Sequence, residues 1–428
     1  MAEGKRKHKR KQGKRGSKAS PGRLLAREVC AQVRKRDAYV RELLDGCRDG
    51  CGLSAEDFDF AQVLAFGVTM CAGTLDEAID RSLSSPKDIK PKVRDCLRIS
   101  AYELLFLHKP AHAVVDQGVE LVRSVAPKAA GLANAVLHKM VDDAQGFPWG
   151  DIEREDRAFA RVYGMPTWLA VRLVEQYGHE QAAQLLSACL EPAPTYLCDN
   201  PLDPKRPFAS DLSAQQVAAL VPLEGMLLEV GAGRGTKTVL LQCRALSTLG
   251  RFVGIHTVDV HAFKERLLSE RLAEMGIDSV MTHTGDARAL DAVEGLPASF
   301  DVAFVDAPCS GMGTLRRHPE IRWHLTPEDV EELVILQLDL LCAAAAHVRP
   351  GGALVYATCS ILREENEGVV SAFLSSTAGE GFVLDPIAPD ELIAEQPGWR
   401  ITDDGCFAAL PTSDGPDGHF AARLRRVG

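Results

Sequence analysis

Short apolar runs alternate with helical segments from Gly225 to the C-terminus, and this alternation limits the possible folds more than any other feature of the chain. Strands separated by helices in this order predict a parallel, doubly wound α/β sheet. The predicted strands are residues 226–230, 252–259, 279–284, 302–306 and 353–358, and the predicted helices between them include residues 263–275 and 327–347. The terminal residues 420–424 are predicted to add an edge strand.

The chain before this sheet has a helical pattern with few alternating β-branched runs. Apolar and small residues recur at every third or fourth position in one stretch, as on the buried face of a helix: Val93, Cys96, Leu97, Ser100, Leu104 and Leu107. Pro110 ends that helix. Residues 21–146 are therefore predicted to form an all-α domain.

The remaining boundaries follow from these two patterns. Residues 147–210 are predicted to be a helical linker region, of which 193–210 are rich in proline and lack periodicity. Residues 211–428 are predicted to form the α/β domain. Residues 1–20 are strongly basic and almost free of apolar side chains, which predicts a disordered tail.

Charge and composition narrow the class of protein. The net charge is −10 although the tail is basic, so the tail is either a solubilising segment or an arm that binds RNA phosphates by releasing counterions. No apolar run approaches the roughly 18–20 residues of a membrane span, and Met1 is not followed by the apolar core of a signal peptide. These features predict a soluble cytoplasmic protein with no membrane partner.

The cysteines predict neither disulfides nor a metal site. The chain has 12 cysteines without a framework pattern, and in a cytosolic protein of this length they are expected to be reduced thiols. Cys47 and Cys51 lack a second Cys or His pair at the spacing of a zinc site. The sequence predicts no oligomeric state.

A glycine-rich loop follows the first predicted strand and reads Glu229-Val230-Gly231-Ala232-Gly233-Arg234-Gly235-Thr236-Lys237. Its glycines let the backbone turn tightly and approach a ligand closely. Glu229 precedes the loop, Asp259 ends the next strand and Asp286 follows the third strand. Acidic strand ends suit the ammonium and sulfonium charges of S-adenosylmethionine better than the pyrophosphate of NAD. The pattern favours S-adenosylmethionine, with NAD or solvated loop acids as the alternatives.

Two cysteines come directly after predicted strands, within Asp306-Ala307-Pro308-Cys309-Ser310 and Tyr356-Ala357-Thr358-Cys359-Ser360. Strand ends of an open α/β sheet present residues to ligands, so the two thiols are predicted to share one site. One thiol can attack a substrate while the other helps to release it. Addition of a thiolate to carbon 6 of cytosine, for example, allows carbon 5 to accept a methyl group. The alternative is that each cysteine is a small buried apolar residue.

These segments resemble the motifs of RNA 5-methylcytosine methyltransferases, and most closely those of the bacterial Sun/Fmu (RsmB-type) enzymes that act on 16S ribosomal RNA. The resemblance extends to residues 316–323, Arg-Arg-His-Pro-Glu-Ile-Arg-Trp, and to Glu364-Glu365-Asn366. Residues 105–115 and 131–137 resemble the NusB-type helical domain with which that group begins. The resemblance implies a NusB-like RNA-binding domain followed by a Rossmann-like methyltransferase domain.

The resemblance also implies roles for individual residues. Cys359 would be the nucleophile, Cys309 would assist product release, and Asp306 would hydrogen-bond the cytosine ring. The implied cofactor contacts are Glu229, Gly231, Gly233, Gly235, Lys237, Asp259, Asp286 and Asp306. The basic side chains of Arg316, Arg317 and Arg322 would either bind RNA phosphates or form ion pairs in a surface loop.

The sequence departs from that family in two places. The family's cofactor loop reads Asp-x-Cys-Ala-Ala-Pro-Gly-Gly-Lys-Thr, of which Lys237 and Thr238 are retained here. Residues 198–213 are too short for the β-containing lobe that usually precedes this loop. A non-catalytic RNA-binding or ribosome-assembly factor therefore stays open. So does a methyltransferase for proteins or small molecules, although it leaves the paired cysteines unexplained. The leading hypothesis is an S-adenosylmethionine-dependent cytosine-C5 methyltransferase acting on an unpaired or extruded base of 16S ribosomal RNA.

Overall fold

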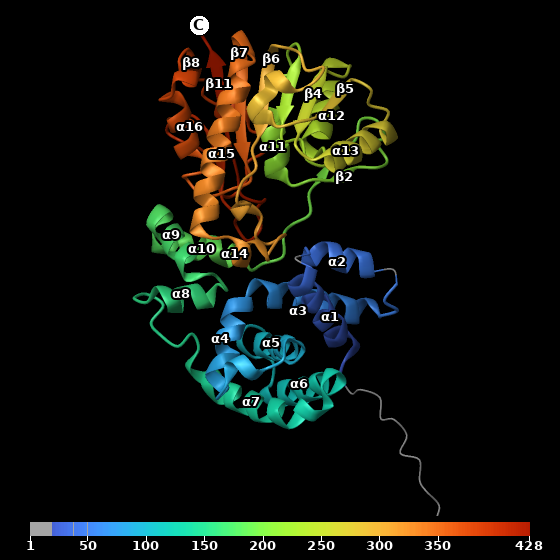
Figure 1. The fold of residues 1–428 in the computed structure, drawn as a ribbon, viewed down its shortest axis with the longest axis vertical. Coiled ribbons are helices and arrows are strands. Elements are labelled where there is room, and N and C mark those ends of the chain that lie inside the picture. The colour runs from blue at the N-terminus through green and yellow to red at the C-terminus, as the bar shows by residue number, and fades with distance from the viewer. Residues whose placement is uncertain (1–18, 37, 49) are drawn as a thin grey trace, which may run out of the picture. The chain divides into compact units, whose positions relative to one another are not determined.

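The computed structural model describes residues 19–36, 38–48 and 50–428 (Figure 1). The chain divides into two compact units, Met1–Gly164 and Met165–Gly428. The division falls inside the segment 147–210 that the sequence predicted as a linker. The predicted basic tail lies outside the described residues except for its last two.

The first unit is helical throughout its described residues, which confirms the predicted all-α domain. Its helices are α1 (Pro21–Arg36), α2 (Val40–Cys47), α3 (Ala55–Met70), α4 (Ala72–Ser82), α5 (Pro91–Leu105), α6 (Ala111–Val125), α7 (Ala130–Asp143) and α8 (Asp156–Val162). Helix α5 begins with a proline, which is tolerated at the first helical position because its missing N–H would have no partner there. Val93, Cys96 and Leu97 are buried as the periodicity predicts.

Membrane-spanning character is weak in the described residues. No helix on its own has the length and apolar composition of a span. Helices α3 and α4 meet that criterion only when they are taken together, and the chain bends by 80° between them.

The second unit holds the α/β sheet and the helices around it. Its helices are α9 (Thr167–Tyr177), α10 (His179–Ala188), α11 (Leu212–Leu220), α12 (Thr236–Leu249), α13 (Ala262–Glu274), α14 (Ile321–His324), α15 (Pro327–Ala346) and α16 (Glu367–Leu374). Its strands are β1 (Leu197–Cys198), β2 (Phe208–Ala209), β3 (Leu227–Val230), β4 (Ile255–Asp259), β5 (Val280–Thr284), β6 (Phe300–Asp306), β7 (Val348–Thr358), β8 (Phe382–Leu384), β9 (Trp399–Ile401), β10 (Phe407–Ala409) and β11 (His419–Arg426).

The main sheet has the strand order β5-β4-β3-β6-β7-β11-β10-β9, and β8 pairs with β11. The strands from β5 to β7 are parallel, whereas β11, β10 and β9 run antiparallel to their neighbours. The sheet is therefore mixed rather than wholly parallel. Because β3, β4, β6 and β7 are parallel, the loops after them gather at one edge of the sheet.

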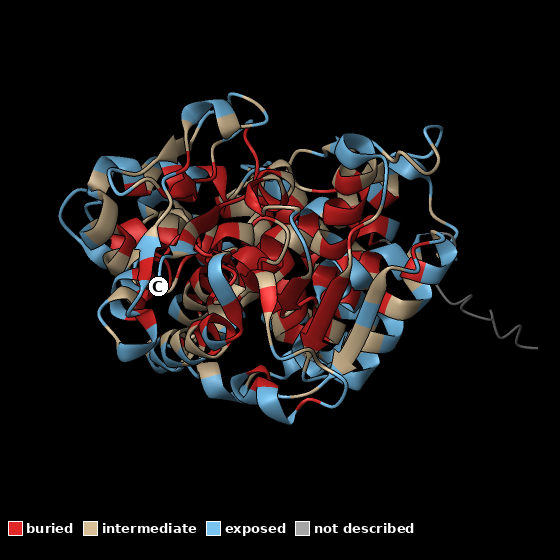
Figure 2. Ribbon diagram, turned by 90° about the horizontal axis from the view of Figure 1, so that it is seen from above, coloured by how far each residue is buried: buried red, intermediate tan, exposed pale blue. Residues whose placement is uncertain are grey.

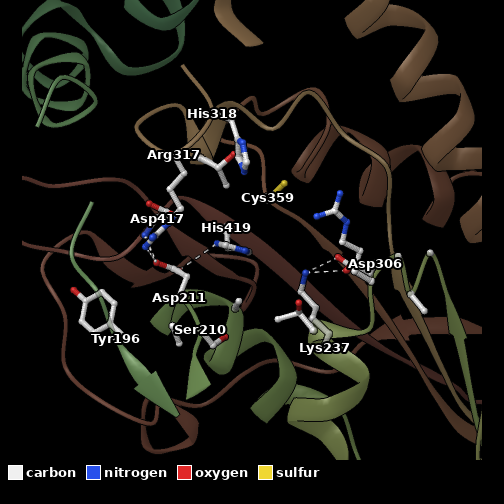
Figure 3. A pocket seen from close by; sticks show the side chains of 18 of the residues that line it. Tyr196, Ser210, Asp211, Lys237, Asp306, Arg317, His318, Cys359, Asp417 and His419 are labelled. Atoms are coloured by element: carbon white, nitrogen blue, oxygen red, sulfur yellow. Dashed lines mark hydrogen bonds and ion pairs between the residues drawn. The ribbon is translucent and has the colours of Figure 1, made fainter. Parts of the chain in front are cut away.

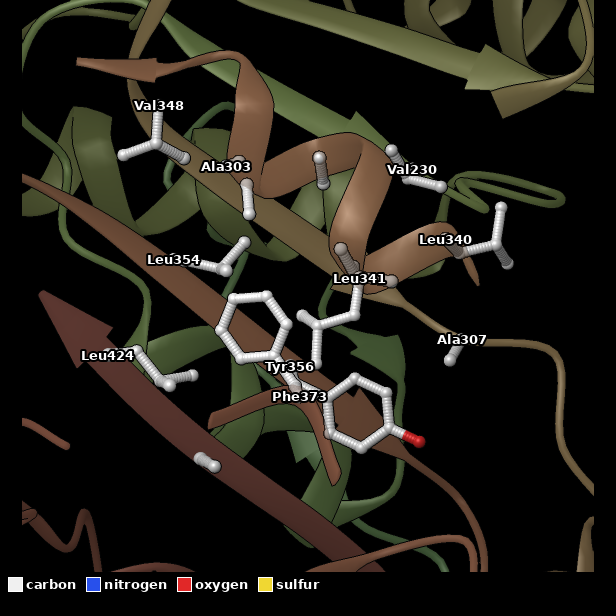
Figure 4. Packing of buried hydrophobic residues seen from close by; sticks show 14 of the residues in the cluster. Val230, Ala303, Ala307, Leu340, Leu341, Val348, Leu354, Tyr356, Phe373 and Leu424 are labelled. Atoms are coloured by element: carbon white, nitrogen blue, oxygen red, sulfur yellow. The ribbon is translucent and has the colours of Figure 1, made fainter. Parts of the chain in front are cut away.

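Helices cover both faces of this sheet. Along β6, Val302 and Phe304 pack in the cluster that includes α11 and α12, whereas Ala303 and Val305 pack in the cluster that includes α15 and α16. Figure 4 shows Leu340 and Leu341 of α15 over the strands. In Figure 2 the buried residues lie on the strands and the inner helix faces. Burial on both faces explains the near-continuous apolar runs of these strands.

One prediction about the second unit is wrong. Residues 420–424 belong to β11, which pairs with β7 on one side and with β10 and β8 on the other, so it is not an edge strand. The proline-rich residues 193–210, which the sequence predicted as a linker, contain the antiparallel pair β1–β2. Strands of two or three residues are too short to show the alternation by which a strand is recognised in sequence.

Candidate active site

The two cysteine segments meet at the ends of neighbouring strands. Strands β6 and β7 are paired in parallel, with Asp306 opposite Ala357, so the loops that follow them start side by side. The sulfur atoms of Cys309 and Cys359 lie 3.2 Å apart. The structure therefore brings together the two thiols that the sequence placed at one site.

The two thiols differ in acidity. A hydrogen bond to Cys359 and burial raise the pKa of Cys309 well above its ordinary value. The hydrogen bond from Cys309 lowers the pKa of Cys359, although burial opposes this, and the positive charge of Lys237 lowers it further. Cys359 is therefore the better thiolate, and Cys309 is the thiol that donates a hydrogen bond to it.

The loop after β3 depends on its glycines. Gly231 has φ +81°, and a Cβ atom there would lie 2.3 Å from the carbonyl oxygen of Asp306. Gly235 has φ +77°, and a Cβ atom would lie 2.2 Å from a methyl carbon of Leu268. Gly233 has φ +57°, and its N–H donates to Asp259 at 3.3 Å. Only glycine fits the first two positions without a shift of the neighbouring chain.

An ion pair connects this loop to the first cysteine segment. Lys237, in the first turn of α12, donates to both carboxylate oxygens of Asp306 at 2.7 and 2.9 Å. Burial opposes the charge of Lys237, but its attraction to Asp306 dominates and raises its pKa. Lys237 is therefore a cation held beside the two thiols.

Two cavities meet at these residues. Cavity A has a volume of about 540 Å³ and extends from Cys309 toward Asp259 and Asp286. Cavity B has a volume of about 510 Å³ and extends toward β11 and the segment around β2 (Figure 3). Both cavities are lined by Gly231, Lys237, Asp306 and Cys359. A ligand in one cavity would therefore lie next to a ligand in the other at Cys359.

The acids of cavity A have different surroundings. Asp259 accepts hydrogen bonds from the backbone N–H groups of Gly233 and His261, at 3.3 and 2.9 Å. Asp286 is half exposed and binds Arg288 at 2.6 Å, and this hydrogen bond lowers the pKa of Asp286. Both carboxylates offer acceptor oxygens to cavity A, which Lys264 and Arg288 also line.

Glu229 does not occupy the place that the sequence predicted. Its side chain is fully buried in β3 and lines neither cavity. Neither carboxylate oxygen has a hydrogen-bond partner in the described part of the chain. Burial raises the pKa of Glu229 to about 8, so its carboxyl group is largely protonated at neutral pH. In this structure Glu229 is therefore not placed to contact a ligand of either cavity directly.

Two of the three predicted RNA-binding arginines are buried. Arg316 forms an ion pair with Asp417 at 2.8 Å, and both side chains are 1% exposed. Arg322 has no exposed surface. In this structure these two guanidinium groups are therefore not placed to bind RNA phosphates, because both are buried. Arg317 is partly exposed and lines cavity B, where it binds Asp211 and Asp417.

Cavity B contains polar residues that the sequence did not reveal. His419, at the start of β11, is 5% exposed, and its Nδ1 lies 3.9 Å from Asp211. Burial and the charge of Lys237 lower the pKa of His419, so the imidazole is neutral at pH 7. Asp211, the first residue of the predicted α/β domain, caps α11. The sequence offered one indication that His419 lies at the site, namely its position directly before the apolar run of the last predicted strand.

Comparisons with known proteins identify the families to which the two parts of the chain are similar. The model of the 16S rRNA methyltransferase RsmB/F family matches residues 217–425, and that of the NusB family matches residues 20–142. A putative methyltransferase of Mycobacterium tuberculosis is 30% identical over 98% of this chain and 99% of its own length. The ribosomal RNA small subunit methyltransferase B of Thermus thermophilus is 29% identical over 96% of this chain and 99% of its own. The crystal structure of PH0851, at 21% identity, has the same fold with a TM-score of 0.71 over 95% of this chain and 98% of that one. The chain therefore belongs to the RsmB/F family of 16S rRNA methyltransferases and carries a NusB-family domain in its N-terminal part.

Proposed function

We propose that this RNA methyltransferase transfers a methyl group from S-adenosylmethionine to carbon 5 of a cytosine in 16S ribosomal RNA. The observation that carries the proposal is the 3.2 Å approach of the Cys309 and Cys359 sulfurs. Cys359 lines both cavities, so it can touch the base and face the methyl donor at once. Methyl transfer to a base through two thiols requires this arrangement.

Cavity A fits S-adenosylmethionine. Its volume of about 540 Å³ is in the range of small-molecule sites. The carboxylates of Asp259 and Asp286 suit a ligand that carries ammonium and sulfonium charges, and Asp259 would accept hydrogen bonds from ribose hydroxyls. Gly231 lines this cavity, and its lack of a side chain lets the loop pass close to the backbone of Asp306. When bound, the cofactor would supply an electrophilic methyl group.

Cavity B would receive the target nucleotide. A cytosine stacked in a helix cannot reach Cys359, so the base must be unpaired or extruded from its stack. The Lys237–Asp306 pair lies where the two cavities meet and offers both a donor and an acceptor. We assign Asp306 the hydrogen bond to the cytosine ring.

The thiols would divide the chemistry between them. The Cys359 thiolate would add to carbon 6, and the electron pair displaced toward carbon 5 would form the new bond to the methyl carbon while the bond from that carbon to the cofactor's sulfur breaks and leaves its electron pair on that sulfur. A base must then take the proton from carbon 5, after which the bond between carbon 6 and sulfur breaks and returns its electron pair to Cys359. We assign Cys309 to assist this elimination because its sulfur contacts that of Cys359.

The two units would have separate tasks. We propose that the NusB-like residues 21–146 bind RNA and that residues 211–428 form the methyltransferase domain. Arg317 is our remaining candidate for a phosphate contact, because it lines cavity B.

The test is to trap the covalent intermediate. Cys309→Ala should accumulate a denaturation-resistant adduct with 16S ribosomal RNA in the presence of S-adenosylmethionine, because elimination is impaired. The adduct should disappear when Cys359→Ala is added. Cys342→Ala changes another partly buried thiol, which lines neither cavity, and should leave methyl transfer unchanged. The absence of both adduct and methyl transfer by the unaltered chain would instead support a non-catalytic RNA-binding factor.

A further inference from the structure

A buried carboxylate, that of Glu365, accepts hydrogen bonds from both cysteine segments and lies outside both cavities. Glu365 follows β7 by seven residues and has no exposed surface. Its Oε1 accepts from the backbone N–H of Ser310 at 2.8 Å and from Nε2 of Gln337 at 2.9 Å. Its Oε2 accepts from the hydroxyl groups of Ser310 and Ser360. Four donors thus satisfy a charge that burial would otherwise make unfavourable.

The two serines on this carboxylate are the residues that directly follow the two thiols. Ser310 follows Cys309 and Ser360 follows Cys359, and their hydroxyl oxygens lie 3.1 Å apart. Both segments are therefore anchored to Glu365 one residue away from the reacting sulfur atoms.

Other contacts fix the carboxylate itself. Gln337 of α15 also donates to the carbonyl oxygen of Pro308 at 2.9 Å, so the first cysteine segment is held on both sides of Cys309. The hydroxyl of Tyr356, in β7, donates to the main-chain carbonyl of Glu365 at 2.6 Å. Glu365 is thus held by strand β7 and by helix α15, which packs on the sheet. Its carboxylate in turn fixes the two loops that carry the cysteines.

We propose that Glu365 is a positioning residue, whose buried carboxylate sets the approach of the Cys309 and Cys359 sulfurs to each other. The catalytic part of this inference rests on the two-thiol reaction proposed above. Glu365 does not line either cavity, so it does not touch substrate or cofactor. Its effect is on the rate of the chemical step and not on binding.

The decisive variant is Glu365→Gln, which keeps the side-chain shape but removes the charge and turns one acceptor into a donor facing other donors. We expect kcat for methyl transfer to fall about 100-fold, since a misplacement of reacting groups of about 1 Å has that effect. KM for RNA and the Kd for S-adenosylmethionine should stay within about twofold, because Glu365 itself lines neither cavity and most of the lining residues do not contact it.

A second readout needs no RNA. A diazene oxidant removes two electrons and two protons from Cys309 and Cys359 and is reduced to the hydrazine while the disulfide forms. This bond requires a specific approach of the two sulfurs, so Glu365→Gln should slow its formation about tenfold. A loss of general stability with the sulfurs still in place would not slow it.

Glu364→Gln is the matched control. Glu364 is the neighbouring residue of the same type, lies near the surface and pairs with Arg172 at 3.2 Å. It should leave both rates unchanged. Should Glu365→Gln fail to fold, Ser310→Ala and Ser360→Ala each remove one hydroxyl donor and should each produce a smaller fall in both rates.

The inference is overturned if Glu365→Gln, or both serine variants where that variant does not fold, keep the kcat and the disulfide rate of the unaltered chain. It is also overturned if Glu364→Gln lowers both rates equally. Failure of the proposed function looks different: the unaltered chain would then transfer no methyl group, while the disulfide rates would still report on Glu365.

Discussion

The ammonium group of Lys237 lies 2.7 Å from the carboxylate of Asp306 at the place where the two cavities meet. Lys237 lies in the first turn of α12, directly after the glycine-rich loop, and Asp306 ends β6. Both residues line both cavities, so the pair lies between the proposed cofactor site and the proposed site of the cytosine base. The same ammonium lowers the pKa of Cys359, after the larger effect of Cys309. Asp306 acts in the opposite direction and raises this pKa, so the two members of the ion pair have opposing effects on the Cys359 thiol.

Lys237→Met should lower methyl transfer about 100-fold or more, the usual loss when one preorganised donor is removed from a reacting centre. The variant should also be less stable by on the order of 3 kcal/mol, because Asp306 is left largely buried without its partner. Adding Asp306→Asn should restore much of the stability but not the activity. Urea unfolding and initial rates measure the two effects, and equal recovery of both would contradict the assignment.

The pH dependence of thiol reactivity should report the contact between the two sulfurs. The hydrogen bond from Cys309 lowers the pKa of Cys359, so Cys309→Ala should raise it and reduce the thiolate fraction at a given pH. We expect the pH midpoint for alkylation of Cys359 by iodoacetamide to be higher in Cys309→Ala than in the unaltered chain. Mass spectrometry of the labelled peptide gives the midpoint. An unchanged midpoint would mean that the two sulfurs do not share a hydrogen bond in solution.

Glu229 should make the protein less stable as the pH rises. Its pKa is about 8 in the folded chain and near the ordinary 4.5 in the unfolded chain. Between these values the unfolded chain releases the proton that the folded chain keeps, so the free energy of unfolding falls with increasing pH. The loss amounts to a few kcal/mol, since one pKa unit corresponds to about 1.4 kcal/mol.

Glu229→Gln should remove this part of the pH dependence and stabilise the chain above pH 8. Glu224→Gln, at an exposed position before β3, serves as the control and should leave the profile unchanged. Urea unfolding across the interval measures both variants. A profile of Glu229→Gln that falls as steeply as that of the unaltered chain would contradict this explanation.

Arg316→Ala should destabilise the fold rather than weaken RNA binding selectively. Removing the guanidinium leaves Oδ1 of the buried Asp417 without its donor, while Arg317 still pairs with Oδ2, so the free energy of unfolding is expected to fall by about 3 kcal/mol. Arg425→Ala breaks a surface pair with Asp385 and should change it by less than about 1 kcal/mol. A side chain that binds an RNA phosphate would behave differently. Its removal would leave the protein folded and would lower the salt dependence of RNA affinity.

Local sequence patterns determined the strands of the parallel sheet and the helices between them. Strand β6 and helix α15 lie within two residues of their predicted ends, because each is long enough to show a clear apolar pattern. Such a pattern also predicts that residues after parallel strands meet at one edge. This is why Cys309 and Cys359 could be placed together from sequence alone.

Tertiary structure alone decided which charged residues face the cavities and which are buried. Arg316 forms its buried ion pair with Asp417, about a hundred residues further along the chain. No local sequence pattern indicates that partner. Glu229 follows apolar residues in β3 and is buried with them, although its place before the glycine loop predicted a ligand contact. The insertion of β11 beside β7 likewise brought His419 to cavity B. Strand formation depends on neighbouring residues, whereas burial of a charge depends on distant partners that only the folded chain supplies.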